Sequence, residues 1–294
     1  MTYRWWDERE DDRAAEQAGP LSEGTQRHYL FAGGAVRSYC VHLPAAYRQG
    51  GPLPLVLSLH GIAADAGQQE RLSGLSNKAE EAGFIAVYPE ALGAPPRWEI
   101  GAGEEAAGDL VFLRALLDHL YAALNVDRRR LIVTGFSNGA GMANRMACAL
   151  AGRIAAVGLV AGAYPAWNGC HPARPVPVVA FHGSADRVVP YEGLGAALPP
   201  IRKWAAGWAR RNRCHPQPSI TYREGCVIGE TWHDAAGRAM VTLYTIKGGG
   251  HTWPGSPLSL ALPGLPPDFA ATDLIWAFAC KQMQTQPALN GSAA

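Results

Sequence analysis

One serine stands between two glycines in residues 131–141, LIVTGFSNGAG, where an apolar run passes into residues that favour a helix. Gly135 and Gly139 leave room for a tight strand-to-helix turn that exposes the Ser137 hydroxyl at the edge of a sheet. The same letters also occur in ordinary Gly/Ser turns, but the strand before them and the helix after them favour a reactive serine. We therefore predict that Ser137 is a nucleophile for acyl transfer.

A serine hydroxyl is a weak nucleophile, so it needs a base within hydrogen-bonding reach and a third group that orients the base. Where such a turn carries a catalytic serine, the acid follows the serine along the chain and the histidine comes last. His251 is the predicted base, because a strand-like segment and three glycines precede it and let its loop fold back toward Ser137. Three histidines in irregular stretches are interpreted as surface residues: His171, His215 and His233.

The predicted acid is Asp186, which lies in the loop after a strand-like segment at residues 176–183. A carboxylate there would orient the imidazole of His251 and stabilise its charged form. Glu192, farther along the same loop, is the second candidate. Aspartate is also common in turns, but its place after Ser137 and before His251 favours the catalytic interpretation.

A tetrahedral oxyanion needs hydrogen-bond donors, and two backbone N–H groups are predicted to supply them. One belongs to Asn138, the residue after the nucleophile, and the other to Ile62 in the LHGIA stretch at residues 59–63. Gly61 would let that stretch approach the serine closely. The alternative for His60 and Gly61 is a simple turn at the end of a strand.

Aromatic side chains in or near the loops that should surround Ser137 are predicted to bind substrate. Together with His60, they are Trp98, Tyr191 and Trp253. Flat rings at these places could hold an aromatic acyl group or a polyester chain. The alternative is that the rings only pack the loops against one another.

Strand-like and helix-like segments alternate along the chain. The strand-like segments are residues 36–44, 54–61, 84–90, 131–136, 155–163, 176–183 and 239–251. Helical periodicity marks residues 108–124, 201–212 and 271–283, and a further helix is expected directly after Ser137. This alternation predicts an α/β fold with a mostly parallel central sheet and helices on both faces. Residues 164–175 leave too little chain for a large lid, so we expect an open cleft.

The composition, 48% hydrophobic and 17% charged over 294 residues, is that of a globular protein with a large core. The net charge is +1 and there is no basic run, so nucleic acid is not an expected partner. No apolar stretch approaches the ~20 residues of a membrane-spanning helix. No H-E-x-x-H or C-x-x-C pattern indicates a metal site, and the predicted chemistry needs no cofactor. One catalytic domain is expected at residues 25–284, with polar extensions at residues 1–24 and 285–294.

The six cysteines leave the disulfide pattern open. Cys148 and Cys280 lie in apolar helical stretches and are expected to be buried thiols. Either Cys148–Cys170 or Cys214–Cys226 could be bridged, and the spacing does not decide between the two pairs. The N-terminal residues lack the apolar stretch of a signal peptide, so we expect either a cytoplasmic protein or a secreted one whose leader is absent.

Six stretches carry a resemblance to a known family: LHGIAADAGQQE, VYPEA, GDLVFLRALLDHL, VTGFSNGAGMANRMAC, FHGSADRVVPYEG and GGGHTWPG. Over residues 37–255 the chain resembles the polyhydroxybutyrate depolymerase-type esterases, which are akin to feruloyl and acetyl-xylan esterases. The resemblance implies an α/β-hydrolase fold and a serine esterase, with Ser137, Asp186 and His251 on the triad positions.

Three features depart from the pattern of that family. Ile62 stands where members usually have a polar residue or cysteine, and Gly108-Asp109-Leu110 stands where members often have Asp-Asp-Val. Cys226 comes earlier than expected for a partner of Cys214. The departures bear on the substrate and the disulfides, not on the fold.

The leading hypothesis is a serine carboxylic-ester hydrolase that works through an acyl-enzyme. Its expected substrates are short-chain, hydroxycinnamoyl or polyhydroxyalkanoate-type esters, small or polymeric. One alternative is a peptidase or thioesterase, because a fold does not fix the substrate. The other is a catalytically silent relative that binds glycans or polyesters. The oligomeric state is left open.

Overall fold

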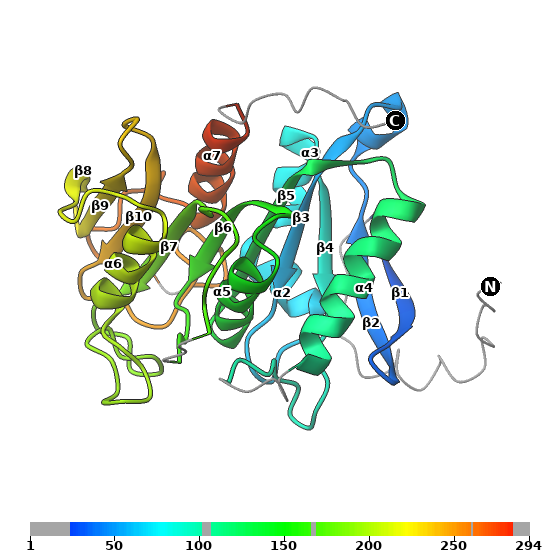
Figure 1. Ribbon diagram of the computed structural model, residues 1–294, viewed down its shortest axis with the longest axis horizontal. Helices are drawn as coiled ribbons and strands as arrows, with labels where there is room; N and C mark the ends of the chain where they lie inside the picture. The colour runs from blue at the N-terminus through cyan, green and yellow to red at the C-terminus, as the bar shows by residue number, and fades with distance from the viewer. Residues whose placement is uncertain (1–23, 102–106, 166–168, 260, 285–294) are drawn as a thin grey trace.

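Ten strands form a single sheet in the computed structural model, which describes residues 24–101, 107–165, 169–259 and 261–284. Their order across the sheet is β1-β2-β4-β3-β5-β6-β7-β10-β9-β8 (Figure 1). The strands are β1 Thr25–Ala32, β2 Ala35–His42, β3 Leu53–Leu59, β4 Ile85–Pro89, β5 Val126–Phe136, β6 Ile154–Val160, β7 Val178–Gly183, β8 Ser219–Glu224, β9 Val227–His233 and β10 Ala239–Ile246. The helices are the 3-10 helix η1 Ala45–Gln49, α2 Ala66–Ser73, α3 Leu75–Ala82, α4 Ala107–Ala123, α5 Asn138–Ala149, α6 Ile201–Arg211 and α7 Ala271–Gln284.

Parallel pairing joins the strands in the middle of the sheet. β4, β3, β5, β6, β7 and β10 run in one direction. Antiparallel pairs extend the sheet at both sides, with β2 against β4 and β1, and β9 against β10 and β8. The predicted mostly parallel sheet is therefore confirmed, and the carboxyl ends of its parallel strands share one edge, where α/β proteins bind their ligands.

The sequence pattern does not predict the antiparallel hairpins at the two sides of the sheet. In the turn between β1 and β2, Gly33 and Gly34 have φ values of 64° and 84°. Both lie in the left-handed region that a two-residue hairpin turn requires, and glycine reaches it without strain. The turn residues, more than the strand pattern, carry the signal for this hairpin.

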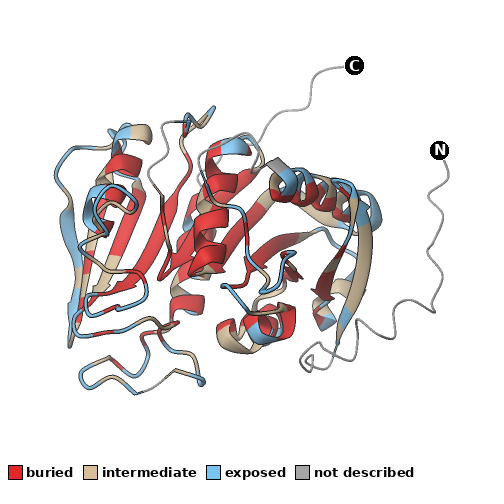
Figure 2. Ribbon diagram, turned by 90° about the horizontal axis from the view of Figure 1, so that it is seen from below, coloured by how far each residue is buried: buried red, intermediate tan, exposed pale blue. Residues whose placement is uncertain are grey.

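Helices cover both faces of the sheet, as predicted. Successive side chains of a strand point to opposite faces, so Leu55, Leu57 and Leu59 of β3 pack in one core with α4, α5 and α6. Val56 packs in a second core with α2, α3 and α7. Figure 1 shows α4, α5 and α6 in front of the sheet, and Figure 2 shows buried residues along the middle strands.

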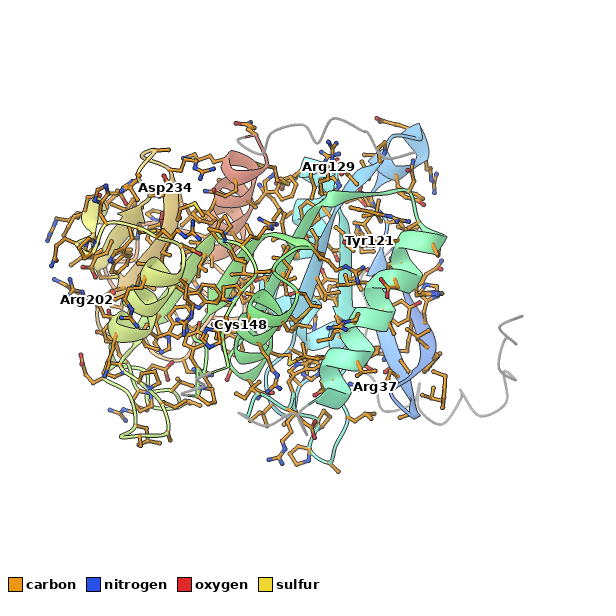
Figure 3. All side chains as sticks on the ribbon, in the orientation of Figure 1. Arg37, Tyr121, Arg129, Cys148, Arg202 and Asp234 are labelled. Carbon is orange, nitrogen blue, oxygen red and sulfur yellow. A yellow bond between two sulfur atoms is a disulfide. The ribbon has the colours of Figure 1, made fainter. Side chains whose placement is uncertain are left out.

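A buried ion pair ties the first hairpin to α4. Arg37 Nη2 on β2 lies 2.7 Å from Asp109 Oδ1, and the two side chains are 4% and 6% exposed. The Arg37 guanidinium, labelled in Figure 3, also lies 4.1 Å from the ring centroid of Phe112. Because a buried charge without a partner is strongly destabilising, this pair holds β2 against the start of α4.

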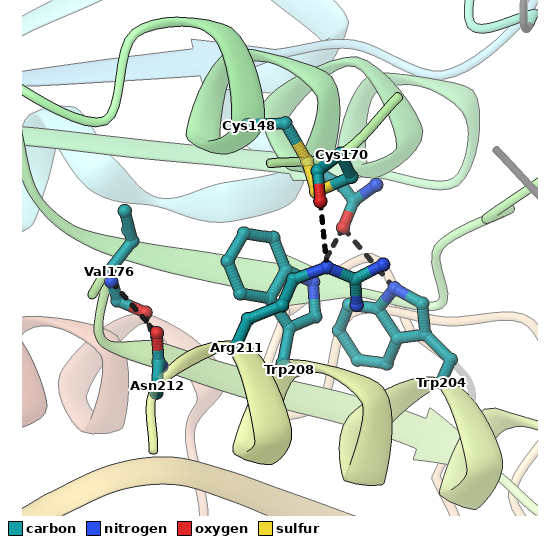
Figure 4. The surroundings of a disulfide bond; sticks show 8 residues. Cys148, Cys170, Val176, Trp204, Trp208, Arg211 and Asn212 are labelled. Carbon is teal, nitrogen blue, oxygen red and sulfur yellow. Dashed lines mark hydrogen bonds between the residues drawn. A yellow bond between two sulfur atoms is a disulfide. The ribbon is translucent and has the colours of Figure 1, made fainter. Parts of the chain in front are cut away.

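A disulfide joins Cys148 and Cys170. It links the last turn of α5 to the loop after β6, where Arg211 Nε of α6 donates a hydrogen bond to the Cys170 carbonyl oxygen at 3.0 Å (Figure 4). The prediction of a buried thiol at Cys148 is therefore wrong. The alternative Cys214–Cys226 bridge is also wrong, because both of these cysteines are free.

The connection between β6 and β7 runs as loop through its described residues, 161–165 and 169–177. The predicted terminal extensions lie outside the described residues, apart from Gly24. Within the described ranges, no helix has the length and apolar character needed to cross a membrane. The same ranges hold no group of three or more histidine, cysteine, aspartate or glutamate side chains arranged to bind a metal ion.

Candidate active site

Ser137 lies between β5 and α5 in a backbone conformation that residues other than glycine rarely adopt. Its φ is 54° and its ψ is −118°. The Ser137 N–H donates to the carbonyl oxygen of Val160 at 2.9 Å, and the Ser137 carbonyl oxygen accepts from the N–H of Gly141 at 3.1 Å. Strained backbone of this kind gathers at functional sites, where surrounding contacts hold it in place.

We name residues 135–139 the serine turn. Both of its glycines lie so close to other backbone atoms that no side chain would fit. A Cβ on Gly139 would overlap the carbonyl oxygens of Leu59 and His60, and a Cβ on Gly135 would overlap the backbone of Gly139. The serine turn therefore packs directly against the end of β3. This contact brings the loop after β3 to the nucleophile candidate.

His251 and Asp186 come together from loops that follow neighbouring parallel strands. His251 follows β10 and Asp186 follows β7, and His251 Nδ1 lies 2.7 Å from Asp186 Oδ2. The ring of His251 also packs on Phe136, the residue before Ser137, with 4.8 Å between ring centroids. A proton on Nδ1 that is donated to Asp186 leaves Nε2 of His251 as the basic nitrogen.

Asp186 has no exposed side-chain surface. Its Oδ1 accepts hydrogen bonds from the N–H groups of Val188 at 2.8 Å and Val189 at 2.9 Å. Burial by itself would raise the pKa of Asp186, but hydrogen bonds from two histidines and a backbone N–H outweigh it. The pKa of Asp186 is therefore held well below its ordinary value, and the side chain is a carboxylate at neutral pH.

His182 on β7 is the second histidine that contacts Asp186, and no prediction from the sequence included it. His182 Nε2 lies 2.8 Å from the Val189 carbonyl oxygen and 3.4 Å from Asp186 Oδ2. Since a carbonyl oxygen only accepts, Nε2 carries the proton, and this N–H faces both oxygens. The sequence does carry a signal for His182, because it lies near the end of the apolar run VPVVAFHG. A polar side chain buried at the end of such a strand needs hydrogen-bond partners, which here include the predicted acid.

The two predicted oxyanion donors lie on neighbouring backbone segments. Asn138 is the first residue of α5, so its N–H has no acceptor inside the helix. Among the described residues, neither the Asn138 N–H nor the Ile62 N–H donates to a backbone acceptor. A Cβ on Gly61 would lie 3.5 Å from the Ser137 Cβ, so the loop after β3 reaches the serine. Unpaired N–H groups at such a place can stabilise an oxyanion.

Three of the four side chains predicted to bind substrate are buried. His60, Trp98 and Trp253 are 0%, 2% and 1% exposed. His60 Nε2 accepts the Ala91 N–H at 3.0 Å and its Nδ1 donates to the Gly61 carbonyl oxygen at 2.7 Å, while burial lowers the pKa of the ring. The indole N–H of Trp253 is bonded to a threonine of α7. The prediction is corrected for these three residues, because buried rings offer a substrate almost no surface.

Tyr191, the fourth residue of that set, is half-buried beside the Asp186 loop. Its hydroxyl lies 2.7 Å from Thr245 Oγ1 on β10. Its ring meets His182 edge-on, with 6.0 Å between centroids. Burial raises the pKa of Tyr191. These contacts give Tyr191 a packing role behind the predicted acid.

The other candidates from the sequence, all within the described ranges, make no side-chain hydrogen bond to His251 or Asp186. Glu192, the second candidate acid, is exposed, and His251 is hydrogen-bonded to Asp186 instead. His171 and His215 are exposed, as predicted, and His233 is half-buried.

Exposed apolar side chains occupy four of the loops at the carboxyl edge of the sheet. They form what we name the apolar rim: Ile62 after β3, Leu92 after β4, Val188 after β7 and Leu258 after β10, each at least 49% exposed. Exposed apolar groups near a polar site commonly mark a binding surface. The apolar rim lies at the same edge of the sheet as Ser137, Asp186 and His251.

Known proteins resemble the chain in sequence. The family model described as "Esterase PHB depolymerase" matches residues 37–191, a range that includes the serine turn and Asp186. "Putative esterase NocK" of Nocardia uniformis subsp. tsuyamanensis is 32% identical over 85% of this chain and 78% of that protein. Feruloyl esterase B of Piromyces equi is 31% identical over 73% of this chain and 42% of that protein, so the chain matches less than half of this relative's length.

Solved structures resemble the chain in fold. An acetyl xylan esterase from Aspergillus awamori has a TM-score of 0.59 at 16% identity, covering 77% of this chain and 94% of that one. The apo form of Thermogutta terrifontis esterase 2 has a TM-score of 0.58 at 14% identity, covering 89% of this chain and 96% of that one. At these identities the likeness concerns the fold, which is the predicted α/β-hydrolase fold.

Proposed function

We propose, from the premise that this chain belongs to the PHB depolymerase family of esterases and is a carboxylic ester hydrolase, that it works through an acyl-enzyme formed on Ser137. His251 acts as the general base and Asp186 orients it. The observation that carries the proposal is the 2.7 Å hydrogen bond between His251 Nδ1 and Asp186 Oδ2, together with the tilted ring contact of His251 with the residue before the strained serine.

The proposed reaction has two halves. His251 Nε2 takes the Ser137 hydroxyl proton as the oxygen attacks the ester carbonyl, and the same proton goes to the leaving alcohol as the tetrahedral intermediate collapses. A water molecule then gives a proton to His251 and attacks the acyl-enzyme, which releases the acid and restores the serine. The low pKa of Asp186 supports its role, because a carboxylate beside the ring stabilises the imidazolium in each half.

The backbone N–H groups of Ile62 and Asn138 are the proposed donors to the oxyanion. They come from the loop after β3 and from the serine turn, which are in close contact. The carbonyl oxygen of the ester gains its negative charge as the tetrahedral intermediate forms. Hydrogen bonds to this oxygen are therefore stronger in the transition state than in the bound substrate.

The proposed substrates are esters whose acyl group is short, aromatic or part of an aliphatic polyester. The apolar rim supports apolar contacts with the substrate, and a curated relative named feruloyl esterase B supports a hydroxycinnamoyl acid as one candidate. The loop connection between β6 and β7 supports access for a bulky or polymeric alcohol side.

The test is a substrate panel with wild type and Ser137→Ala. The panel holds p-nitrophenyl acetate, butyrate and octanoate, methyl ferulate, a 3-hydroxybutyrate oligomer and a matched amide. We expect wild type to cleave esters far faster than the amide, and kcat to fall by roughly 10⁶-fold in Ser137→Ala. Ser219→Ala, on exposed strand β8, is the matched control and should keep wild-type rates.

Labelling with a fluorophosphonate followed by mass spectrometry locates the nucleophile independently. A single adduct on the peptide that contains Ser137, absent in Ser137→Ala, is the expected result. Ester turnover that survives in Ser137→Ala would contradict the proposal, and so would an adduct on another serine. The rank order of ferulate against hydroxybutyrate identifies the acyl group.

A further inference from the structure

Trp98, in the loop after β4, is bonded to both segments that carry the proposed oxyanion donors. Its indole Nε1 donates to the carbonyl oxygen of His60 at 2.9 Å, two residues before Ile62. Its backbone N–H donates to Asn138 Oδ1 at 2.7 Å, and its carbonyl oxygen accepts from Asn138 Nδ2 at 3.1 Å. One residue therefore bridges the loop after β3 and the serine turn through three hydrogen bonds.

The bridge is buried and has its own support. Trp98, Asn138 and His60 are 2%, 5% and 0% exposed, so water does not compete for these bonds. The rings of His60 and Trp98 lie 5.2 Å apart. The neighbouring Glu99 donates its N–H to Asp109 Oδ2 at 2.8 Å, and Asp109 is held in turn by the buried ion pair to β2.

The same loop also holds the residue after Ile62. The N–H of Ala63 donates to the Pro96 carbonyl oxygen at 2.9 Å, and Ala63 has a φ of 58°. An alanine in this left-handed conformation is strained, and hydrogen bonds at His60 and Ala63 hold the backbone on each side of Ile62. The two contacts come from Trp98 and Pro96.

We propose that Trp98 is a positioning residue that sets the distance and orientation of the Ile62 and Asn138 N–H groups relative to each other. The inference rests on the proposed function, because it concerns the oxyanion site of that reaction. Oxyanion donors act only when they lie about 2.7–3.1 Å from the oxyanion, and loss of one donor typically costs ~10²–10³ in kcat. A small rotation of either segment would therefore lower the rate without changing any group that touches the substrate.

The test compares Trp98→Phe with Trp208→Phe. Phenylalanine keeps an aromatic ring at position 98 but has no N–H for the His60 carbonyl oxygen. Trp208 is the matched control, because it is 1% exposed and its Nε1 donates to an asparagine of α5, Asn144, at 2.8 Å (Figure 4). Both changes remove the same side-chain atoms and one indole hydrogen bond, but only the first removes a bond to the loop after β3.

The readout is turnover of an ester and of its thionoester, in which sulfur replaces the carbonyl oxygen. Sulfur is larger and a poorer hydrogen-bond acceptor, so an ordered oxyanion site favours the oxygen ester. We expect Trp98→Phe to lower kcat for the oxygen ester by about tenfold or more at unchanged KM, as for an interaction made only in the transition state. The ratio of oxygen-ester to thionoester kcat/KM should fall, whereas Trp208→Phe should keep the wild-type kcat and ratio.

A second variant guards against misfolding of the first. Asn138→Ala keeps its own backbone N–H but removes both side-chain bonds to Trp98, so it should give the same fall in the ratio. The losses in kcat of the two single variants should not multiply in the double variant, because they disturb one geometry.

Two results would overturn the inference. One is a Trp98→Phe enzyme that folds and keeps kcat within twofold of wild type. The other is an equal loss for the oxygen ester and the thionoester in both Trp98→Phe and Asn138→Ala, which indicates a general packing defect. An inactive wild type would instead overturn the proposed function, so the two failures are distinguishable.

Discussion

Asp186 is a fully buried carboxylate whose charge depends on a small set of donors. Two backbone N–H groups bind one oxygen, and His251 and His182 bind the other. Removing a charge from water is costly unless hydrogen bonds replace the lost hydration. The folded structure therefore stabilises the charged form of Asp186 relative to the neutral form.

The low pKa of Asp186 makes the folding stability depend on pH. An aspartate in the unfolded chain titrates near ~4, above the folded value. Asp186 therefore stabilises the folded state in full above that pH, and its contribution is lost as the pH falls toward the folded pKa. Urea unfolding of wild type and Asp186→Asn from pH 7 to pH 3 should show a stability difference that shrinks on acidification.

An exposed aspartate provides the control for that experiment. Asp268 is exposed, so Asp268→Asn should differ from wild type by a small amount at each pH. A difference between wild type and Asp186→Asn that stays constant down to pH 3 would show that Asp186 has an ordinary pKa.

Among the elements, the serine turn between β5 and α5 has no room for a larger side chain at its two glycines. A Cβ on Gly139 would overlap two backbone oxygens at the end of β3, and a backbone cannot yield as a flexible side chain can. Gly139→Ala should therefore destabilise the fold by about 3 kcal/mol or more and abolish esterase activity. Thermal unfolding and initial rates measure both effects.

Gly152→Ala is the matched control for that prediction. Gly152 is exposed, and a Cβ there would meet nothing within 4 Å. It should keep its activity and change stability by less than about 0.5 kcal/mol. A stable and active Gly139→Ala enzyme would mean that the serine turn has more freedom than its contacts indicate.

The disulfide fixes the end of α5 that is farther from Ser137. Cys148 and Cys170 are 22 residues apart, and closing a loop of this size in the unfolded chain stabilises the fold by roughly 3 kcal/mol. The double variant Cys148→Ser, Cys170→Ser should lose about this much stability yet keep its kcat at 25 °C, because Ser137 lies at the start of the helix.

Reducing agent provides a second measurement of the same bridge. Wild type in dithiothreitol should approach the stability of the double variant in urea unfolding. Cys280→Ser, which removes a free and half-buried thiol, is the control and should leave this response to dithiothreitol intact. A wild type whose stability is the same with and without reductant would contradict the prediction.

For the whole molecule, access to the carboxyl edge of the sheet is the main consequence of the fold. Ser137, Asp186 and His251 lie after β5, β7 and β10, and the apolar rim lies in loops at the same edge. The connection between β6 and β7 has no helix in its described residues. A substrate can therefore reach the edge without displacing a helical lid at that connection.

Open access predicts kinetics without interfacial activation. The rate of tributyrin hydrolysis should follow simple saturation through the solubility limit, because the described part of the β6–β7 connection holds no helix that would have to move at the lipid–water interface. A lidded lipase assayed beside it should show a sharp rise at that limit. A jump of several-fold by this enzyme at the same concentration would indicate a closed site.

Most of the central fold follows from the sequence, and so does the order in which the candidate catalytic residues occur along the chain. Apolar runs such as residues 54–61 can only be buried, and their alternation with amphipathic helices leaves a parallel sheet covered on both faces as the solution. The chain order of Ser137, Asp186 and His251 follows from loops at the ends of such strands. The structure and the comparisons confirm the fold and the family, and the catalytic roles of the three residues stay a prediction.

Local sequence patterns predicted burial and side-chain contacts poorly where these depend on how the chain folds back on itself. The sequence around Trp98 and Trp253 does not distinguish a ring that lines a cleft from a ring that fills a core. Both rings are buried because segments distant in the chain pack against them. His182 contacts Asp186 and Val189, four and seven residues later, only because the loop after β7 folds back onto it.

The sequence by itself determined the parallel strands in the middle of the sheet and most of the helices that cover them, because hydrophobic periodicity is a property of neighbouring residues. It also indicated the serine turn, since a strand-like run leads into the two glycines and the serine and helix-forming residues follow them. Only the tertiary structure decided that Cys148 pairs with Cys170 and that Trp98 bridges the oxyanion segments. Each of these depends on the distance between atoms far apart in the chain, which is set when the sheet and its two layers of helices pack together.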